Sequence, residues 1–139
     1  MQDQRTLGQR VDRIRRRAQR DPEGAAVLAS AVLRELHGGG GPAGPYAELH
    51  TIRGRGVALM ALRLGQDRYD QRVARAGREQ DLGRRTALLE LAERERPHWS
   101  AAGRQLGISH TAARDFGEPA LAEAMTEQGL PTAVVGAPS

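Results

Sequence analysis

Four neighbouring side chains have the chemistry to bind another molecule: Ser109, His110, Thr111 and Arg114. They fall in the first turns of a predicted helix, where exposed side chains can enter a groove on a partner. Hydroxyl groups can bind phosphates or base edges, and an arginine can hold a guanine with two hydrogen bonds. The four residues are therefore suited to recognising a nucleic-acid surface.

The run from Trp99 to Arg114 carries the signals of two short helices joined by a tight turn. Gly103 is small enough to let two helices cross closely, and Gly107 can take a left-handed conformation in the turn. Ser109 can then cap the second helix. This layout predicts a helix-turn-helix that presents its second helix to the major groove. An ordinary helical corner with a glycine cap is the alternative, because short motifs give false positives.

At these residues the sequence resembles the recognition half of bacterial helix-turn-helix regulators. The run Leu-Gly-Ile-Ser-His-Thr, followed shortly by Arg, is familiar in that family. The sequence departs from the family at two positions: Gly103 stands where alanine is usual, and Ala113 stands where a larger aliphatic residue is usual. The resemblance implies that the helix after Gly107 reads DNA.

A longer stretch, residues 15–36 followed by 52–77, is similar to small actinobacterial helix-turn-helix proteins with an N-terminal helical hairpin. Gly65, Tyr69 and Gly77 are part of the pattern that carries this second resemblance. It implies two helix-turn-helix units in tandem. The first unit lacks a serine cap and is degraded or serves as scaffold.

Composition excludes much enzyme chemistry. The chain has 139 residues and 21 Lys+Arg, all of them arginine, and it has no cysteine. It therefore cannot form a Schiff base, supply a P-loop lysine, use a thiol nucleophile or build a cysteine zinc site. The four histidines are too scattered to predict a metal site. We expect no enzymatic activity, no cofactor and no metal.

The same composition predicts an all-α fold. Alanine, leucine and arginine favour helices, whereas aromatic residues make up only 3% of the chain. Leu, Ile, Val and Phe supply 26 of 139 residues, so the hydrophobic core must be thin. No apolar run is long enough to cross a bilayer, and the N-terminus lacks the apolar stretch of a signal peptide. We expect a cytoplasmic protein with no membrane partner.

Apolar spacing, caps and breakers divide the chain into an N-terminal helical hairpin and a helix-turn-helix bundle. The predicted domains are an arginine-rich hairpin over 1–37, a Gly/Pro linker over 38–45, a helix-turn-helix domain over 46–129 and a flexible tail over 130–139. Within the helix-turn-helix domain, the degraded unit covers about 50–85 and the clearer unit covers about 86–117. The expected helices are 2–20, 21–37, 46–64, 67–76, 81–96, 99–106, one from Ser109 to Phe116 and one from Pro119 to Gln128.

Charge is concentrated in two arginine blocks. Residues 1–20 hold seven arginines against two aspartates, and 53–85 hold nine arginines against four acids, whereas 117–139 are acidic. Guanidinium groups suit phosphate binding, although solvated helix faces would explain the blocks equally well. The predicted contacts to the DNA backbone are Arg104, Arg72, Arg75, Arg78, Arg84, Arg85, Arg15, Arg16 and Arg17.

These observations predict a sequence-specific DNA-binding protein, a transcriptional regulator of actinobacterial, phage or plasmid origin. One such unit buries little surface, so we expect a homodimer on double-stranded DNA, and the N-terminal hairpin could also hold a protein partner. The alternative is a non-enzymatic protein-interaction adaptor that uses the helix-turn-helix as scaffold. A phage-encoded inhibitor or an assembly factor, such as a small terminase subunit, would be of that class.

Overall fold

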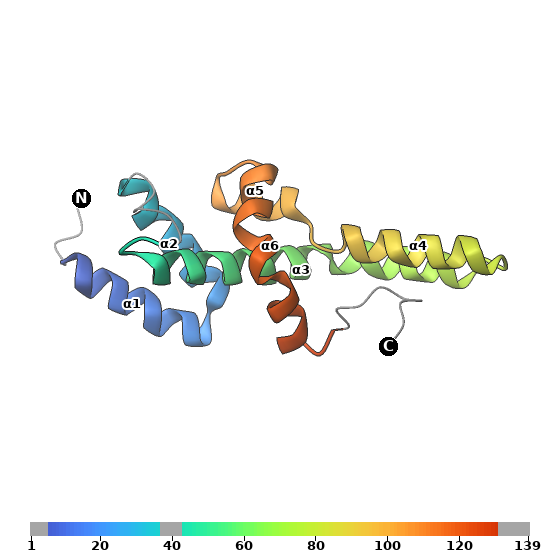
Figure 1. Ribbon diagram of the computed structural model, residues 1–139, viewed down its shortest axis with the longest axis horizontal. Helices are drawn as coiled ribbons and strands as arrows, with labels where there is room; N and C mark the ends of the chain where they lie inside the picture. The colour runs from blue at the N-terminus through green and yellow to red at the C-terminus, as the bar shows by residue number, and fades with distance from the viewer. Residues whose placement is uncertain (1–5, 37–42, 131–139) are drawn as a thin grey trace.

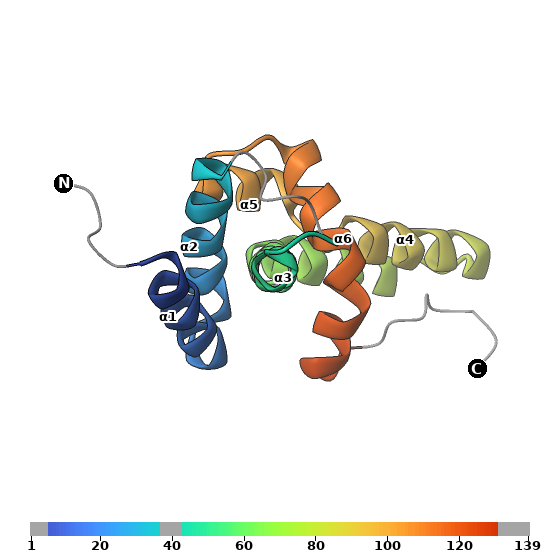
Figure 2. The same ribbon diagram turned by 60° about the vertical axis from the view of Figure 1, so that its left-hand side comes forward.

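The computed structural model describes residues 6–36 and 43–130, and the secondary structure of these ranges is entirely helical. The all-α prediction is confirmed. Six helices make up the described ranges: α1 (Leu7–Arg20), α2 (Pro22–Glu35), α3 (Ala47–Gly77), α4 (Leu82–Glu95), α5 (Trp99–Leu106) and α6 (His110–Glu127). The long α3 is the central element, and all five other helices pack against it (Figures 1 and 2). None of the described helices is both long and apolar enough to span a membrane.

The N-terminal hairpin forms, and a side-chain cap begins each of its two helices. Thr6 and Gln9 build a reciprocal capping box at the start of α1. Asp21 caps α2 by accepting from the Gly24 N–H at 3.0 Å, and Pro22 occupies the first turn. These contacts fix the junction between the two antiparallel helices.

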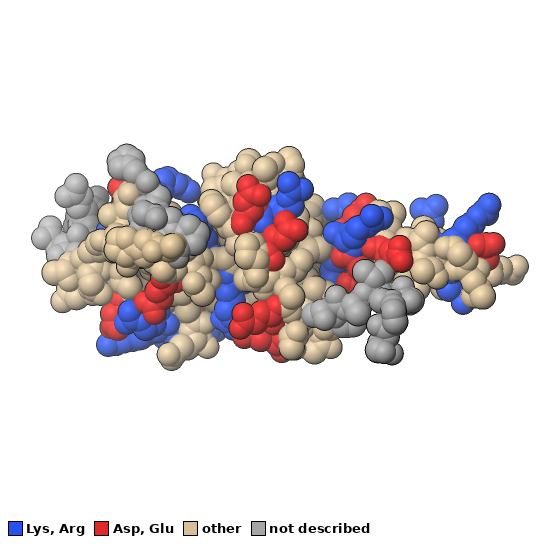
Figure 3. All heavy atoms as spheres, in the orientation of Figure 1, with Lys and Arg blue, Asp and Glu red and all other residues tan. Residues whose placement is uncertain are grey.

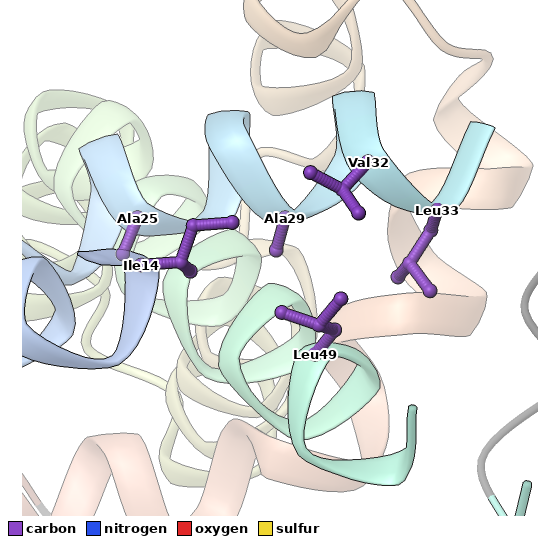
Figure 4. Close-up of a cluster of buried hydrophobic side chains, with 6 residues drawn as sticks. All are labelled: Ile14, Ala25, Ala29, Val32, Leu33 and Leu49. Atoms are coloured by element: carbon purple, nitrogen blue, oxygen red, sulfur yellow. The ribbon is translucent and has the colours of Figure 1, made fainter. Parts of the chain in front are cut away.

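The hairpin shares its core with the first turns of α3. Ile14 of α1 packs with Ala29, Val32 and Leu33 of α2 and with Leu49 of α3 (Figure 4). The predicted linker over 38–45 lies largely outside the described residues, as does most of the predicted tail. The shared core means that α2 is held directly by α3.

The predicted helices over 46–64 and 67–76 are wrong, because α3 is one helix of 31 residues. Gly65 does not end a helix. It is buried, and a Cβ atom there would collide with the carbonyl oxygen of Arg96. The segment after α4 crosses α3 at this point, where His98 also donates its backbone N–H to the Ala61 carbonyl at 2.9 Å. The glycine permits close approach of two backbones.

The tandem arrangement is wrong for the same reason. The degraded unit expected at about 50–85 needs two short helices with a turn between them, and α3 runs through that span without a break. The second half of α3 instead pairs with α4 in a long antiparallel hairpin that projects from the rest of the molecule (Figure 1). We call this hairpin, residues 66–95, the arm.

The helix of the arm begins as predicted but packs differently. Asp81 caps α4 by accepting from the Arg84 N–H at 2.9 Å. Two leucines of this helix, Leu82 and Leu91, are 72% and 38% exposed, and Ala92 is the buried residue of α4. With a single neighbouring helix, α4 can bury only a narrow stripe.

Residue 119 does not begin a new helix. The expected helices over 109–116 and from Pro119 are one helix, α6, which continues through the proline. A proline cannot donate to the carbonyl four residues earlier, which is that of Asp115. Asp115 and Pro119 both lie on the exposed side of α6, where water can bond to the freed carbonyl. Gly129, with φ 70°, follows the end of the helix, as expected.

Candidate nucleic-acid interface

The turn between α5 and α6 has the predicted geometry. Gly107 adopts the left-handed conformation (φ 71°, ψ 31°). The N–H of Ile108 donates to the Gly103 carbonyl at 2.8 Å, which closes the end of α5. Ser109 then caps α6 by accepting from the Ala112 N–H at 3.1 Å. The turn is therefore defined by one left-handed glycine and one serine cap.

Gly103 is required by the way the turn packs. A Cβ atom at this position would lie 2.7 Å from the Ile108 carbonyl oxygen and 3.0 Å from that of Ser109. The turn backbone thus approaches α5 more closely than an alanine would allow. Gly103 departs from the alanine that is usual in helix-turn-helix regulators, and the packing of this turn against α5 requires the glycine.

Both helices of the unit are seated on the middle of α3. Val57, Met60 and Ala61 of α3 form a buried cluster with α5 and α6. Trp99 packs against this cluster, and its ring fills the space beside Gly117, where a Cβ atom would lie 2.5 Å away. Trp99 is therefore part of the core, and α6 has a fixed position on α3.

The four predicted base-contacting residues come together on one exposed end of α6. Ser109, His110, Thr111 and Arg114 are all exposed. Arg114 lies one turn beyond His110 and Thr111, so the three side chains share a face. Arg114 forms no ion pair with any described carboxylate. Its guanidinium is available to a ligand.

A cationic group that was only partly predicted surrounds the N-terminus of α5. Arg104 donates to the Ser100 hydroxyl at 3.3 Å, and Arg68 of α3 lies 3.4 Å from Nε2 of His98. Burial, with the nearby charges of Arg68 and Arg104, lowers the pKa of His98. Sequence reasoning missed Arg68 because it ended the preceding helix at Gly65.

The other predicted backbone arginines of this block belong to the arm. Arg72 pairs with Glu95, and Arg85 donates to the Glu79 carbonyl at 2.7 and 3.0 Å. Arg75, Arg78 and Arg84 border a hollow at the arm. The arm extends away from α5 and α6, so the structure does not bring this set beside the predicted base contacts (Figure 1).

The three consecutive arginines of α1 are engaged within the protein. Arg15 holds Glu48 at the start of α3 at 2.7 Å, and this contact raises the pKa of Arg15 and lowers that of Glu48. Arg16 pairs with Asp12, and Arg17 pairs with Asp21. These contacts compete with phosphate binding. Positive and negative side chains are likewise interspersed over the visible face in Figure 3.

Two further arginines that were not predicted lie beneath the turn. Arg34 of α2 donates to the Leu106 carbonyl at 3.4 Å, and the Arg53 guanidinium carbon lies 3.6 Å from the centre of the Phe116 ring. Only the contact between α2, α3 and α6 brings these residues together, so no sequence spacing could indicate them. Over the described ranges, no group of His, Asp and Glu side chains is arranged to hold a metal ion.

Comparison with known proteins adds no family to this geometry. No family model matches the chain, and no curated protein or solved structure shows significant similarity to it.

Proposed function

We propose that the protein binds double-stranded DNA and reads bases in the major groove with the N-terminal turns of α6. The observation that carries this proposal is the exposed set Ser109, His110, Thr111 and Arg114 on a helix that is fixed by the Gly107 turn. A rigid helix with short polar residues and one arginine at its exposed N-terminus suits base recognition. In this account the protein is a transcriptional regulator that resides with the nucleoid.

The four residues have different roles in this proposal. Ser109 uses its oxygen as an acceptor in the helix cap, which leaves its O–H to donate to a phosphate. His110 and Thr111 lie in the first turn and contact the edges of bases or a phosphate. Arg114 reaches deeper, since its side chain is the longest, and donates two hydrogen bonds to a guanine.

Phosphate contacts come from the group at the start of α5. Arg104 and Arg68 carry positive charge at the start of α5, and both lie close enough to His98 to lower its pKa. We no longer assign this role to Arg15, Arg16 and Arg17, since each is paired with a carboxylate. One unit of this size buries little DNA surface, so we propose that a homodimer binds paired half-sites.

Selection from random duplexes tests this function. The purified protein is mixed with random-sequence double-stranded DNA over a salt series, and the retained DNA is sequenced. We expect enrichment of a palindromic or directly repeated motif, with affinity that falls as salt rises. Binding without any enriched motif would contradict sequence-specific reading.

A protein-interaction adaptor is the second candidate, and the mixed charge beside Arg114 favours it. Asp115 and Glu118 are exposed on the same helix and would repel a phosphate backbone. In that case the exposed end of α6 would contact a protein instead of DNA. Failure to bind duplex DNA at low salt, together with a stable complex with a partner protein, would favour the adaptor.

A further inference from the structure

A small, partly open cavity lies beneath the turn, between α2, α3 and α6. Its volume is about 220 Å³, and it is bordered by Ser30, Leu33, Arg34, Arg53, Ile108 and Phe116. A second hollow of about 300 Å³ opens on the other side of Arg53 and Phe116, between α3 and α6. The Arg53–Phe116 pair therefore lies between two spaces. Pockets of drug-sized ligands span roughly 300–1,000 Å³, so the first space is smaller than these and the second is at the lower end of the range.

Arg53 is a half-buried cation without a matching anion among the described carboxylates. Its Nε is buried and has no hydrogen-bond partner, and it forms no ion pair with a carboxylate of the described ranges. Burial lowers the pKa of the Arg53 guanidinium, with no carboxylate acting against the shift. One terminal nitrogen contacts Nδ1 of His50 at 2.9 Å, and the Phe116 ring covers one face. These contacts offset only part of the cost of burying the charge.

A second polar group borders the cavity without a partner. The Ser30 hydroxyl is buried and has no hydrogen-bond partner. Arg34 contributes a second guanidinium to the same cavity. A buried hydroxyl and a buried guanidinium Nε that are both unsatisfied are costly to a folded protein, and an acceptor bound beside them would reduce that cost. The remaining wall is made of Leu33, Ile108 and Phe116, which is apolar.

We propose that this cavity binds a small organic carboxylate. Arg53 Nε and the Ser30 hydroxyl are both covered in the structure, so these side chains must turn toward the cavity for the carboxylate to accept from them. The charge of Arg34 would then lie beside the carboxylate, and the apolar body would pack against Leu33, Ile108 and Phe116. A carboxylate satisfies this set because it is acceptor-only and carries the charge that Arg53 lacks. The limited volume restricts the body to about one ring or a short aliphatic chain.

Such a ligand would contact the elements that carry the predicted base contacts. Ile108 directly precedes the Ser109 cap, and Phe116 belongs to α6 two residues after Arg114. Arg34 already holds the end of α5 through the Leu106 carbonyl. The binding itself is independent of the proposed function. A change in DNA affinity on ligand binding rests on that function. It occurs when the ligand binds the free protein and the DNA-bound protein with different affinities.

Titration of the full chain by NMR tests the binding. Benzoate and hexanoate serve as carboxylate probes, benzyl alcohol serves as the neutral match, and inorganic phosphate serves as the competing anion. We expect saturable shifts at Ser30, Arg34 and Arg53 with a carboxylate and at least tenfold weaker binding of benzyl alcohol. Absence of saturable binding by both carboxylates, or binding of phosphate alone, would overturn the proposal.

Two variants locate the anion. Arg53→Met keeps an unbranched apolar stem and removes the guanidinium with its charge, and it should weaken carboxylate binding about tenfold or more. Arg13→Met is the matched control, since Arg13 is an exposed residue of α1 away from the cavity. If Arg53→Met proves unstable, Ser30→Ala provides the milder test, with several-fold weaker binding expected. Unchanged affinity in a folded Arg53→Met or Ser30→Ala protein would overturn the assignment.

A separate titration measures the regulatory consequence. DNA affinity is measured with and without the carboxylate that binds, in the wild type and in Arg53→Met. Coupling is supported if the carboxylate changes DNA affinity severalfold in the wild type and leaves it unchanged in Arg53→Met. Ligand binding without any DNA binding would contradict the proposed function but leave the cavity assignment intact, so the two failures are distinguishable.

Discussion

The two halves of α3 hold their partners in different ways. In the middle of the helix, Val57 to Leu62 are buried against α5 and α6, and small residues allow the backbones to approach closely. Beyond Gly65, Ala76 is the buried residue that α3 contributes to the arm, and Ala92 is the one from α4. The arm therefore has little apolar core, whereas the turn region is tightly packed.

Polar contacts add to the narrow apolar seam of the arm. The Tyr69 hydroxyl donates to Glu93 at 3.0 Å, and burial together with Glu93 raises the pKa of Tyr69. Arg96 is nearly fully buried, with its guanidinium carbon 3.9 Å from the centre of the Tyr69 ring. Arg72 pairs with Glu95 farther out. The comparison shows that a leucine-rich helix with one neighbouring helix buries few of its side chains, so hydrogen bonds and ion pairs supply a larger share of its contacts.

A matched pair of leucine truncations should show the largest contrast. Leu62→Ala removes a side chain that is 1% exposed and should lower the free energy of unfolding by about 3 kcal/mol, because a cavity remains. Leu82→Ala, at the exposed start of α4, should change it by less than about 0.5 kcal/mol. Chemical denaturation followed by circular dichroism measures both. Equal losses would show that the arm is covered in solution.

A pair of glycine substitutions sharpens the same contrast. Gly103→Ala forces the turn backbone to move and should cost about 1–3 kcal/mol. Gly77→Ala, at the end of α3, meets no neighbouring atom within 4 Å and should stabilise the protein by about 0.5 kcal/mol. Melting curves of the two variants give opposite shifts if this account holds. A neutral Gly103→Ala would refute the tight packing of the turn.

The ionic contacts of the arm should have a small and local effect. Arg72→Met breaks the pair with Glu95, which is partly exposed, so the loss should stay below about 1 kcal/mol. Hydrogen exchange should become faster at the amides of α4 and remain unchanged at those of α6. Arg94→Met is the control, because Arg94 is exposed on α4, the other helix of the arm. Faster exchange throughout the chain would mean that the arm and the turn region unfold together.

Protonation of His98, at the junction of the arm and the turn region, should have the smallest effect on the free energy of unfolding. Its folded-state pKa lies below 6.5, so the unfolded chain takes up the proton first as the pH falls. The His98 contribution thus lowers stability as the pH drops below about 6.5, until the folded protein is protonated as well. Denaturation at several pH values should show this slope, and His98→Gln should flatten it. Arg68→Met should flatten it in part, since Arg68 helps to lower the pKa.

Local signals in the sequence predicted the ends of the elements well. The caps at Asp21 and Ser109 and the left-handed Gly107 all form, because each depends on residues close in the chain. Whether a glycine ends a helix or accommodates a neighbour depends on tertiary contacts. Gly65 was therefore misassigned, and the two halves of α3 were separated.

The parts of the site set by tertiary contacts could not be predicted. Arg53 and Phe116 are far apart in the sequence, and their contact exists because α6 crosses α3 at Gly54, where a Cβ atom would lie 2.7 Å from the Phe116 carbonyl oxygen. A helix can continue through a proline where the carbonyl that loses its hydrogen bond is exposed to water, as the Asp115 carbonyl is at Pro119. Burial is not visible in one sequence, so the sequence predicted a helix start at Pro119. The exposed end of α6, by contrast, was located from its cap and turn.

The most direct test of the central claim compares Arg114→Ala with Arg94→Ala in selections from random duplex DNA. Arg94 is an exposed arginine of α4 and controls for the loss of one positive charge. The account predicts that Arg114→Ala loses discrimination at one position of the selected motif, worth about 1–3 kcal/mol, whereas Arg94→Ala retains the motif. Equal loss of affinity for every sequence in both variants would contradict base reading by α6.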